Sequence, residues 1–75
     1  MSLPINKVEY YRMRYPYGTK LRLTKPIEDT YSPKEVGDIF IVDYIDDACQ
    51  IHGNWVCGGS LAIVIGEDEF EIVIE

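Results

Sequence analysis

The sequence predicts a mainly β fold, a small five-stranded barrel preceded by a short helix. Three observations support this prediction: the chain has only 75 residues, apolar residues recur in short runs after residue 19, and turn-forming residues separate these runs. A chain of this size can bury one hydrophobic core and not two. Five short strands with a helix are typical of a closed or nearly closed barrel. We therefore expect a single domain over residues 1–75, with a helical arm at 1–16 and the barrel at 17–75.

The arm contains a predicted helix over residues 7–14. Asn6 is a favourable N-cap, and Glu9 stands three positions later, as in a capping box. Pro16 disfavours helical backbone in the residue before it, so the helix must end there. Gly18 then predicts a turn, after which the periodicity changes from helical to alternating.

The first two strands differ in their hydrophobic pattern. Residues 20–24 alternate leucine with polar side chains, which predicts a strand with Leu21 and Leu23 buried. A loop over residues 25–36 follows, and long loops often carry function. The second strand, residues 39–45, is apolar on both faces and therefore needs cover on both sides. One face is predicted to hold Ile39 and Ile41, and the other Phe40, Val42 and Tyr44.

The remaining strands are predicted from turn residues and alternation. A third strand runs from residue 48 to about 56, after a turn at Asp46-Asp47. Gly58-Gly59 supplies the positive φ angles of a tight hairpin that leads to a fourth strand at 60–65. A turn at 66–68 follows. The fifth strand alternates, with Phe70, Ile72 and Ile74 predicted inward and Glu71, Val73 and Glu75 outward.

Charge is unevenly distributed along the chain, whose net charge is −6. Residues 1–25 carry six basic side chains against Glu9 alone and sum to +5, which leaves −11 for residues 26–75. In one interpretation the basic arm packs across the acidic body of its own chain or of a neighbour. In the other, the basic end meets an anionic partner. Salt weakens either arrangement.

The first functional hypothesis is a small binding module for protein interaction or self-assembly. The second strand carries more apolar surface than one core can cover, so the arm or another chain must cover the rest. The expected partner is a protein or a second copy of the chain, which would make the protein a homo-oligomer. The candidate interaction residues are Ile39, Ile41 and Tyr44.

The alternative hypothesis is nucleic-acid binding through the basic, tyrosine-rich arm. Aromatic rings can stack on bases while cations meet phosphates. The acidic net charge disfavours this hypothesis because it repels a polyanion at longer range. The candidate contacts are Tyr11, Arg12, Arg14, Tyr15, Tyr17, Lys20 and Arg22.

Other chemistries find little support in the sequence. Cys49, His52 and Cys57 have the residue types of a zinc site, but in a continuous strand the imidazole points away from both thiols. At the usual rise per residue the thiols lie roughly 26 Å apart, too far for a disulfide. The histidine has no nucleophile on its own face, so we expect no catalysis, metal or cofactor. No membrane span is expected, and residues 1–4 lack the pattern of a secretion signal, which predicts a cytoplasmic protein.

Several short motifs between Tyr15 and Ile74 occur in an order that resembles a known family. They are Arg14-Tyr15-Pro16 with Gly18-Thr19, Asp46-Asp47-Ala48, Gln50-Ile51-His52, Trp55, Gly59-Ser60-Leu61 and Gly66-Glu67-Asp68-Glu69-Phe70. Together they resemble the bacterial domain of unknown function family 4314, small proteins associated with phages and integrative elements of Gram-positive bacteria. That family is similar in pattern to SH3-like barrels, so the resemblance implies an SH3-like fold and a mobile-element setting, and no activity. The chain departs from the family at Glu35-Val36-Gly37, Phe40 and Val56-Cys57-Gly58.

Overall fold

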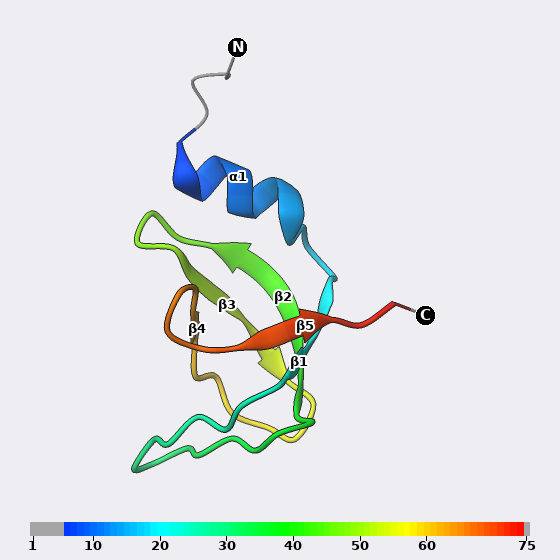
Figure 1. Ribbon diagram of the computed structural model, residues 1–75, viewed down its shortest axis with the longest axis vertical. Coiled ribbons are helices and arrows are strands. Elements are labelled where there is room, and N and C mark those ends of the chain that lie inside the picture. Colours follow the sequence, from blue (N-terminus) through cyan, green and yellow to red (C-terminus); the bar gives the residue numbers. More distant parts are fainter. Residues whose placement is uncertain (1–5, 75) are drawn as a thin grey trace.

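The computed structural model describes residues 6–74, which form a five-stranded antiparallel sheet and a short helix (Figure 1). The elements are α1 (Lys7–Arg14), β1 (Lys20–Leu23), β2 (Ile39–Ile45), β3 (Gln50–Trp55), β4 (Ile63–Val64) and β5 (Phe70–Ile72). The strand order is β4-β3-β2-β1-β5, so the sheet is open, with β4 and β5 at its edges. The mainly β prediction is confirmed. The prediction about a secretion signal depended on residues 1–4, and the prediction for the last strand depended in part on Glu75. These residues lie outside the described residues.

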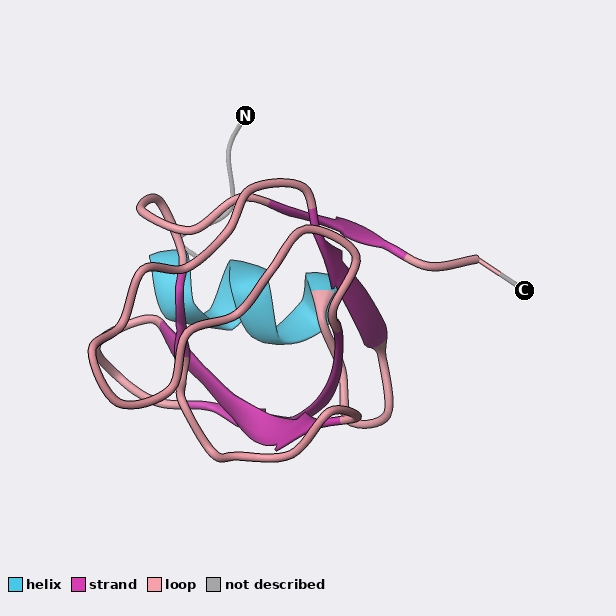
Figure 2. Cartoon of the chain, turned by 90° about the horizontal axis from the view of Figure 1, so that it is seen from below, coloured by secondary structure: helices cyan, strands magenta, loops and turns pink. Residues whose placement is uncertain are grey.

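The helix begins and ends as predicted. The Glu9 N–H donates to Asn6 Oδ1 at 2.9 Å, which satisfies one of the free donors of the first turn. The Tyr15 N–H still donates to Tyr11 O at 2.8 Å, and the chain leaves helical geometry before Pro16. Val8 and Tyr11 pack against the core, so α1 lies across one end of the curved sheet (Figure 2). This helix is too short and too polar to cross a membrane, and it is the only one in residues 6–74.

The core lies on the concave side of the sheet. Alternation in β1 buries both leucines, as predicted, and Phe40 packs edge to face on Trp55 at 4.8 Å between ring centroids. The indole Nε1–H of Trp55 donates to the Leu61 carbonyl at 2.8 Å. Gly53 is required in β3, because a Cβ there would overlap the Ile41 carbonyl oxygen. The buried apolar residues are Leu21, Leu23, Phe40, Val42, Ile45, Ile51, Trp55 and Ile63.

A β-bulge at Asp43 corrects the predicted faces of β2. Val42 pairs with Gly53, but the next pair joins Tyr44 to His52, so one residue of β2 has no partner in β3. The extra residue shifts the alternation by one. Ile45 therefore enters the core, and Tyr44 lies on the solvent side instead of sharing a face with the buried residues of β2.

The predicted ends of the later strands are also corrected. Gly58 and Gly59 have positive φ angles of 104° and 96°, but they lie within a longer connection between β3 and β4 and do not form a tight hairpin. Phe70 packs against the core as predicted, whereas Ile72 is 36% exposed and Ile74 is 90% exposed. Ile72 keeps the predicted side, since it pairs directly with buried Leu21, but both isoleucines are exposed because β5 is an edge strand whose end extends past the core.

Candidate interaction surface

The three candidate interaction residues come together on the solvent side of the sheet. Ile39, Ile41 and Tyr44, here called the β2 stripe, all point away from the core, and it is the bulge that brings Tyr44 to the same side as the isoleucines. The isoleucines are half-buried, and Tyr44 is 55% exposed. Arg22 and Lys20 of β1 flank the two isoleucines on one side of the stripe. The stripe is therefore an apolar line through a largely polar face.

Tyr17 extends this surface beyond β2. Its side chain is 82% exposed, and it lines two adjacent shallow hollows of about 320 and 190 Å³. Ile41 lines the larger hollow, Tyr44 lines the smaller one, and Asp43 lines both. Two backbone hydrogen bonds fix the turn to β2: the Gly18 N–H donates to Val42 O at 2.8 Å, and the Val42 N–H donates to Thr19 O at 2.9 Å. The sequence singled out Tyr17 only for nucleic acid, because its proximity to β2 is a tertiary feature.

A chain of side chains holds Tyr44 in place. Its ring stacks on the His52 imidazole, with centroids 4.6 Å apart and planes 10° from parallel. His52 Nε2 is 2.8 Å from Asp46 Oδ2, and the other oxygen of that carboxylate accepts from the Ala48 and Gln50 N–H groups at 2.9 and 3.0 Å. The hydrogen bond from His52, followed by that from Gln50, holds the pKa of Asp46 below its ordinary value. The tyrosine ring is therefore positioned by a carboxylate that the backbone itself fixes.

Asp46 is a residue whose supporting role the sequence analysis missed. It was predicted only to form a turn. Aspartate in a turn commonly accepts from the backbone two residues on, and this signal was present in the sequence. Its contact with His52 depends on the register of β2 and β3, which is set by the bulge.

Three basic side chains of residues 1–25, one of them in the arm, pair with carboxylates of the acidic body, in agreement with the first interpretation of the charge pattern. Arg12 donates through Nε to Ile45 O at 3.0 Å and pairs with Asp47 at 3.2 Å. Arg22 pairs with Glu71 at 2.6 Å. A third pair joins the two segments, between Lys25 and Glu69 at 3.2 Å.

The seven candidate nucleic-acid contacts do not form one exposed surface. Tyr11 and Tyr15 are half-buried against the core, and Tyr15 also meets Phe70 edge to face at 5.5 Å. The Arg14 guanidinium lies 5.7 Å from the Tyr15 ring and donates to its hydroxyl at 3.3 Å. Lys20 is half-buried and also has an interaction partner. Of the tyrosines in the set, only Tyr17 is exposed.

The cysteines and His52 do not converge. Cys49 lies in the turn before β3 with a φ of 62°, and both it and Cys57 are free thiols. His52 contacts Asp46 on the solvent side, as the predicted strand faces require. Within residues 6–74, no three His, Cys, Asp or Glu side chains are grouped so as to hold a metal ion.

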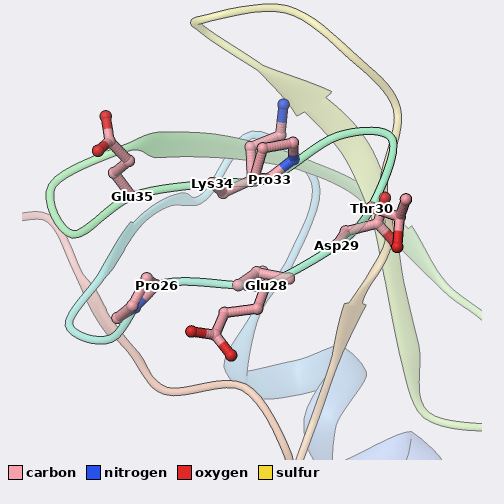
Figure 3. Close-up of a pocket in the computed structure, with 8 residues that line it drawn as sticks. Pro26, Glu28, Asp29, Thr30, Pro33, Lys34 and Glu35 are labelled. Carbon is pink, nitrogen blue, oxygen red and sulfur yellow. The ribbon is translucent and has the colours of Figure 1, made fainter.

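The long loop at 25–36 forms a separate hollow of about 470 Å³ (Figure 3). Ile27 and Lys34 exchange backbone hydrogen bonds of 2.8 and 3.0 Å, which join the two arms of the loop. The Lys34 side chain leaves the hollow, donates to Gly58 O at 2.8 Å and lies 5.4 Å from the Trp55 ring centroid. Glu28 and Glu35 contribute carboxylates to the lining. The hollow thus lacks the buried, convergent polar groups of a ligand site.

Comparison with known proteins places this structure in a family. The family model described as "Domain of unknown function (DUF4314)" matches residues 5–73. No curated protein and no solved structure matches the chain.

Proposed function

The chain belongs to the DUF4314 family, and from the surface just described we propose that it is a non-enzymatic protein-interaction module whose contact surface is the β2 stripe together with Tyr17. The observation that carries this proposal is the exposure of two tyrosines beside half-buried isoleucines on the outer face of the sheet. Tyrosine is enriched at the centres of protein interfaces because its ring buries a large apolar area while its hydroxyl keeps a hydrogen bond.

The contacts within the protein hold the two tyrosines of this surface in position before a partner binds. Tyr44 is held by His52 and Asp46, and the turn that carries Tyr17 is bonded to β2. A side chain that is already ordered loses less conformational entropy on binding, so more of the contact energy contributes to affinity. The hollows on either side of Tyr17 give a partner's side chains a place to enter.

Three finer predictions from the sequence belong to the same proposal. The SH3-like barrel is supported by the strand order, in which the last strand returns beside the first. The phage or mobile-element setting is what the family resemblance implies, and the cytoplasmic location is a prediction from the sequence. They indicate where to search for a partner, namely in lysate of a Gram-positive bacterial host.

Nucleic-acid binding is the weaker candidate. Arg12 and Arg22 already pair with carboxylates, and a polyanion would have to displace those contacts against the acidic net charge. Binding to a short single-stranded oligonucleotide that weakens steeply with salt would favour this candidate over the one we propose.

Partner capture with matched tyrosine variants tests the proposal. We expect the wild-type protein to retain a specific host protein that the Tyr17→Ala and Tyr44→Ala variants lose. Tyr31→Ala is the control, because Tyr31 is 94% exposed but lies in the 25–36 loop, away from the stripe. Equal retention by all three variants, or equal loss, would place the contact surface elsewhere.

A further inference from the structure

The two edges of the sheet differ in whether their backbone groups are occupied. At the outer edge of β4, the Val64 N–H donates to Asp68 Oδ2 at 2.8 Å, and its carbonyl accepts from the Glu67 and Asp68 N–H groups at 3.1 and 2.9 Å. The turn after β4 therefore caps this edge. Natural proteins protect edge strands in this way because a free edge can pair with another chain.

The other edge has no such cap within the described residues. The Thr24 N–H donates to Glu69 O at 3.0 Å and the Val73 N–H donates to Lys20 O at 2.9 Å, so the odd-numbered residues of this segment face β1. In an antiparallel ladder the alternate residues face the opposite way. Phe70, Ile72 and Ile74 thus direct their N–H and carbonyl groups to the free edge of β5, beside which no strand of residues 6–74 pairs.

Apolar side chains accompany these free backbone groups. Ile72 is 36% exposed and Ile74 is 90% exposed, and both share the side of Phe70. A free edge that is also apolar combines hydrogen bonds with burial when a further strand is added.

We propose that a second copy of this chain pairs antiparallel with β5, so that two sheets join into one across a two-fold axis. In the proposed register the axis passes beside Ile72, which faces Ile72 of the second copy, and Phe70 faces Ile74 in both directions. A two-fold axis perpendicular to a sheet keeps each face on its own side, so the exposed isoleucines of both copies gather on one face.

Charge favours this register over its neighbour. With the axis at Ile72, Glu71, the only glutamate of β5, opposes Val73 of the second copy and meets no like charge across the contact. With the axis at Glu71, two like charges would stand directly opposite, which is destabilising. The ion pair between Arg22 and Glu71 further reduces the negative charge beside the new contact. The surface is distinct from the β2 stripe, so the dimer does not depend on the proposed function.

Sedimentation of the full chain tests the dimer. We expect a monomer–dimer equilibrium between low micromolar concentration and about 1 mM, the range of weak small interfaces. Added salt should strengthen association, because each copy carries a net charge of −6 and salt screens their repulsion.

The Ile72→Pro variant removes the outward N–H without touching the bonds to β1, and proline is tolerated on edge strands, so it should remain monomeric. Ile72→Val keeps the N–H and should dimerise like the wild type.

A second variant keeps the test decisive if the proline change unfolds the protein. Ile74→Asp alters a residue that is 90% exposed and lies outside β5, so the fold should persist while dimerisation is lost. A wild-type monomer throughout the series would overturn the proposal, as would dimers of both Ile74→Asp and Ile72→Pro.

Cross-linking tests the register. In a background with Cys49→Ala and Cys57→Ala, the Ile72→Cys variant should form a disulfide-linked dimer, because directly opposed residues in a hydrogen-bonded pair have Cα atoms about 5.5 Å apart, within disulfide range. The Glu71→Cys variant should link much more slowly. Faster linking through position 71 would contradict the register and with it the proposal.

Discussion

Replacing Lys34 by methionine should destabilise the protein although the residue lies in the 25–36 loop, outside every strand. Lys34 is 6% exposed; its ammonium donates to Gly58 O at 2.8 Å and lies 5.4 Å from the Trp55 ring centroid. Methionine keeps an apolar stem of similar length but has neither charge nor donor. The variant therefore loses the contacts that tie the 25–36 loop to the β3–β4 connection.

The magnitude follows from those two contacts. A hydrogen bond from a charged donor is worth about 1.5–3 kcal/mol, and a cation–π contact about 0.5–2 kcal/mol. Because Gly58 is exposed, water replaces part of the lost bond, and burying the ammonium has its own cost. We therefore expect the free energy of unfolding to fall by about 1–2 kcal/mol, which lowers the Tm by roughly 4–8 °C per kcal/mol in a domain of this size.

The assay is unfolding in urea. Circular dichroism and the fluorescence of the single tryptophan monitor the transition. Lys25→Met is the matched control, since Lys25 is well exposed and forms only a surface pair with Glu69. That control should lose no more than about 1 kcal/mol. A Lys34→Met variant as stable as the control would refute the reasoning.

Three further predictions concern stability. Gly53→Ala should lower the free energy of unfolding in urea by about 2 kcal/mol, because the new Cβ would overlap the Ile41 carbonyl oxygen and force the strands apart. A variant as stable as the wild type would contradict this prediction. Asn6→Ala should cost about 1 kcal/mol through loss of the cap, with reduced helical dichroism; an unchanged spectrum and stability would count against it. Because folding lowers the pKa of Asp46 from about 3.8, its stabilisation is complete above that pH and lost as pH falls through the folded value. The stability difference between the wild type and Asp46→Asn should therefore narrow below about pH 4, and a gap independent of pH would refute that link.

The features that the sequence predicted correctly are those that depend on local pattern. Alternation identified Leu21 and Leu23, and cap chemistry placed the start of α1 at Asn6. The bulge at Asp43 could not be predicted, because β2 is apolar on both faces and its alternation therefore fits more than one register. The exposure of Ile74 likewise depends on the position of β5 at the edge of the sheet.

The candidate site was predicted in part for the same reason. The β2 stripe was identified because an apolar strand needs cover on both sides. The contribution of Tyr17, and the support that Asp46 gives to Tyr44 through His52, depend on contacts between separate elements. The burial of Lys34 is also tertiary, since its acceptor Gly58 lies in another loop.

The most direct test of the central claim is the dissociation constant of the captured partner, measured by titration calorimetry. We predict that Tyr44→Ala weakens binding tenfold or more, equivalent to about 1.4 kcal/mol, while Tyr31→Ala leaves it unchanged. The wild-type complex should also show a negative heat-capacity change from apolar burial. A dissociation constant unaffected by Tyr44→Ala would contradict the claim that the β2 stripe is the contact surface.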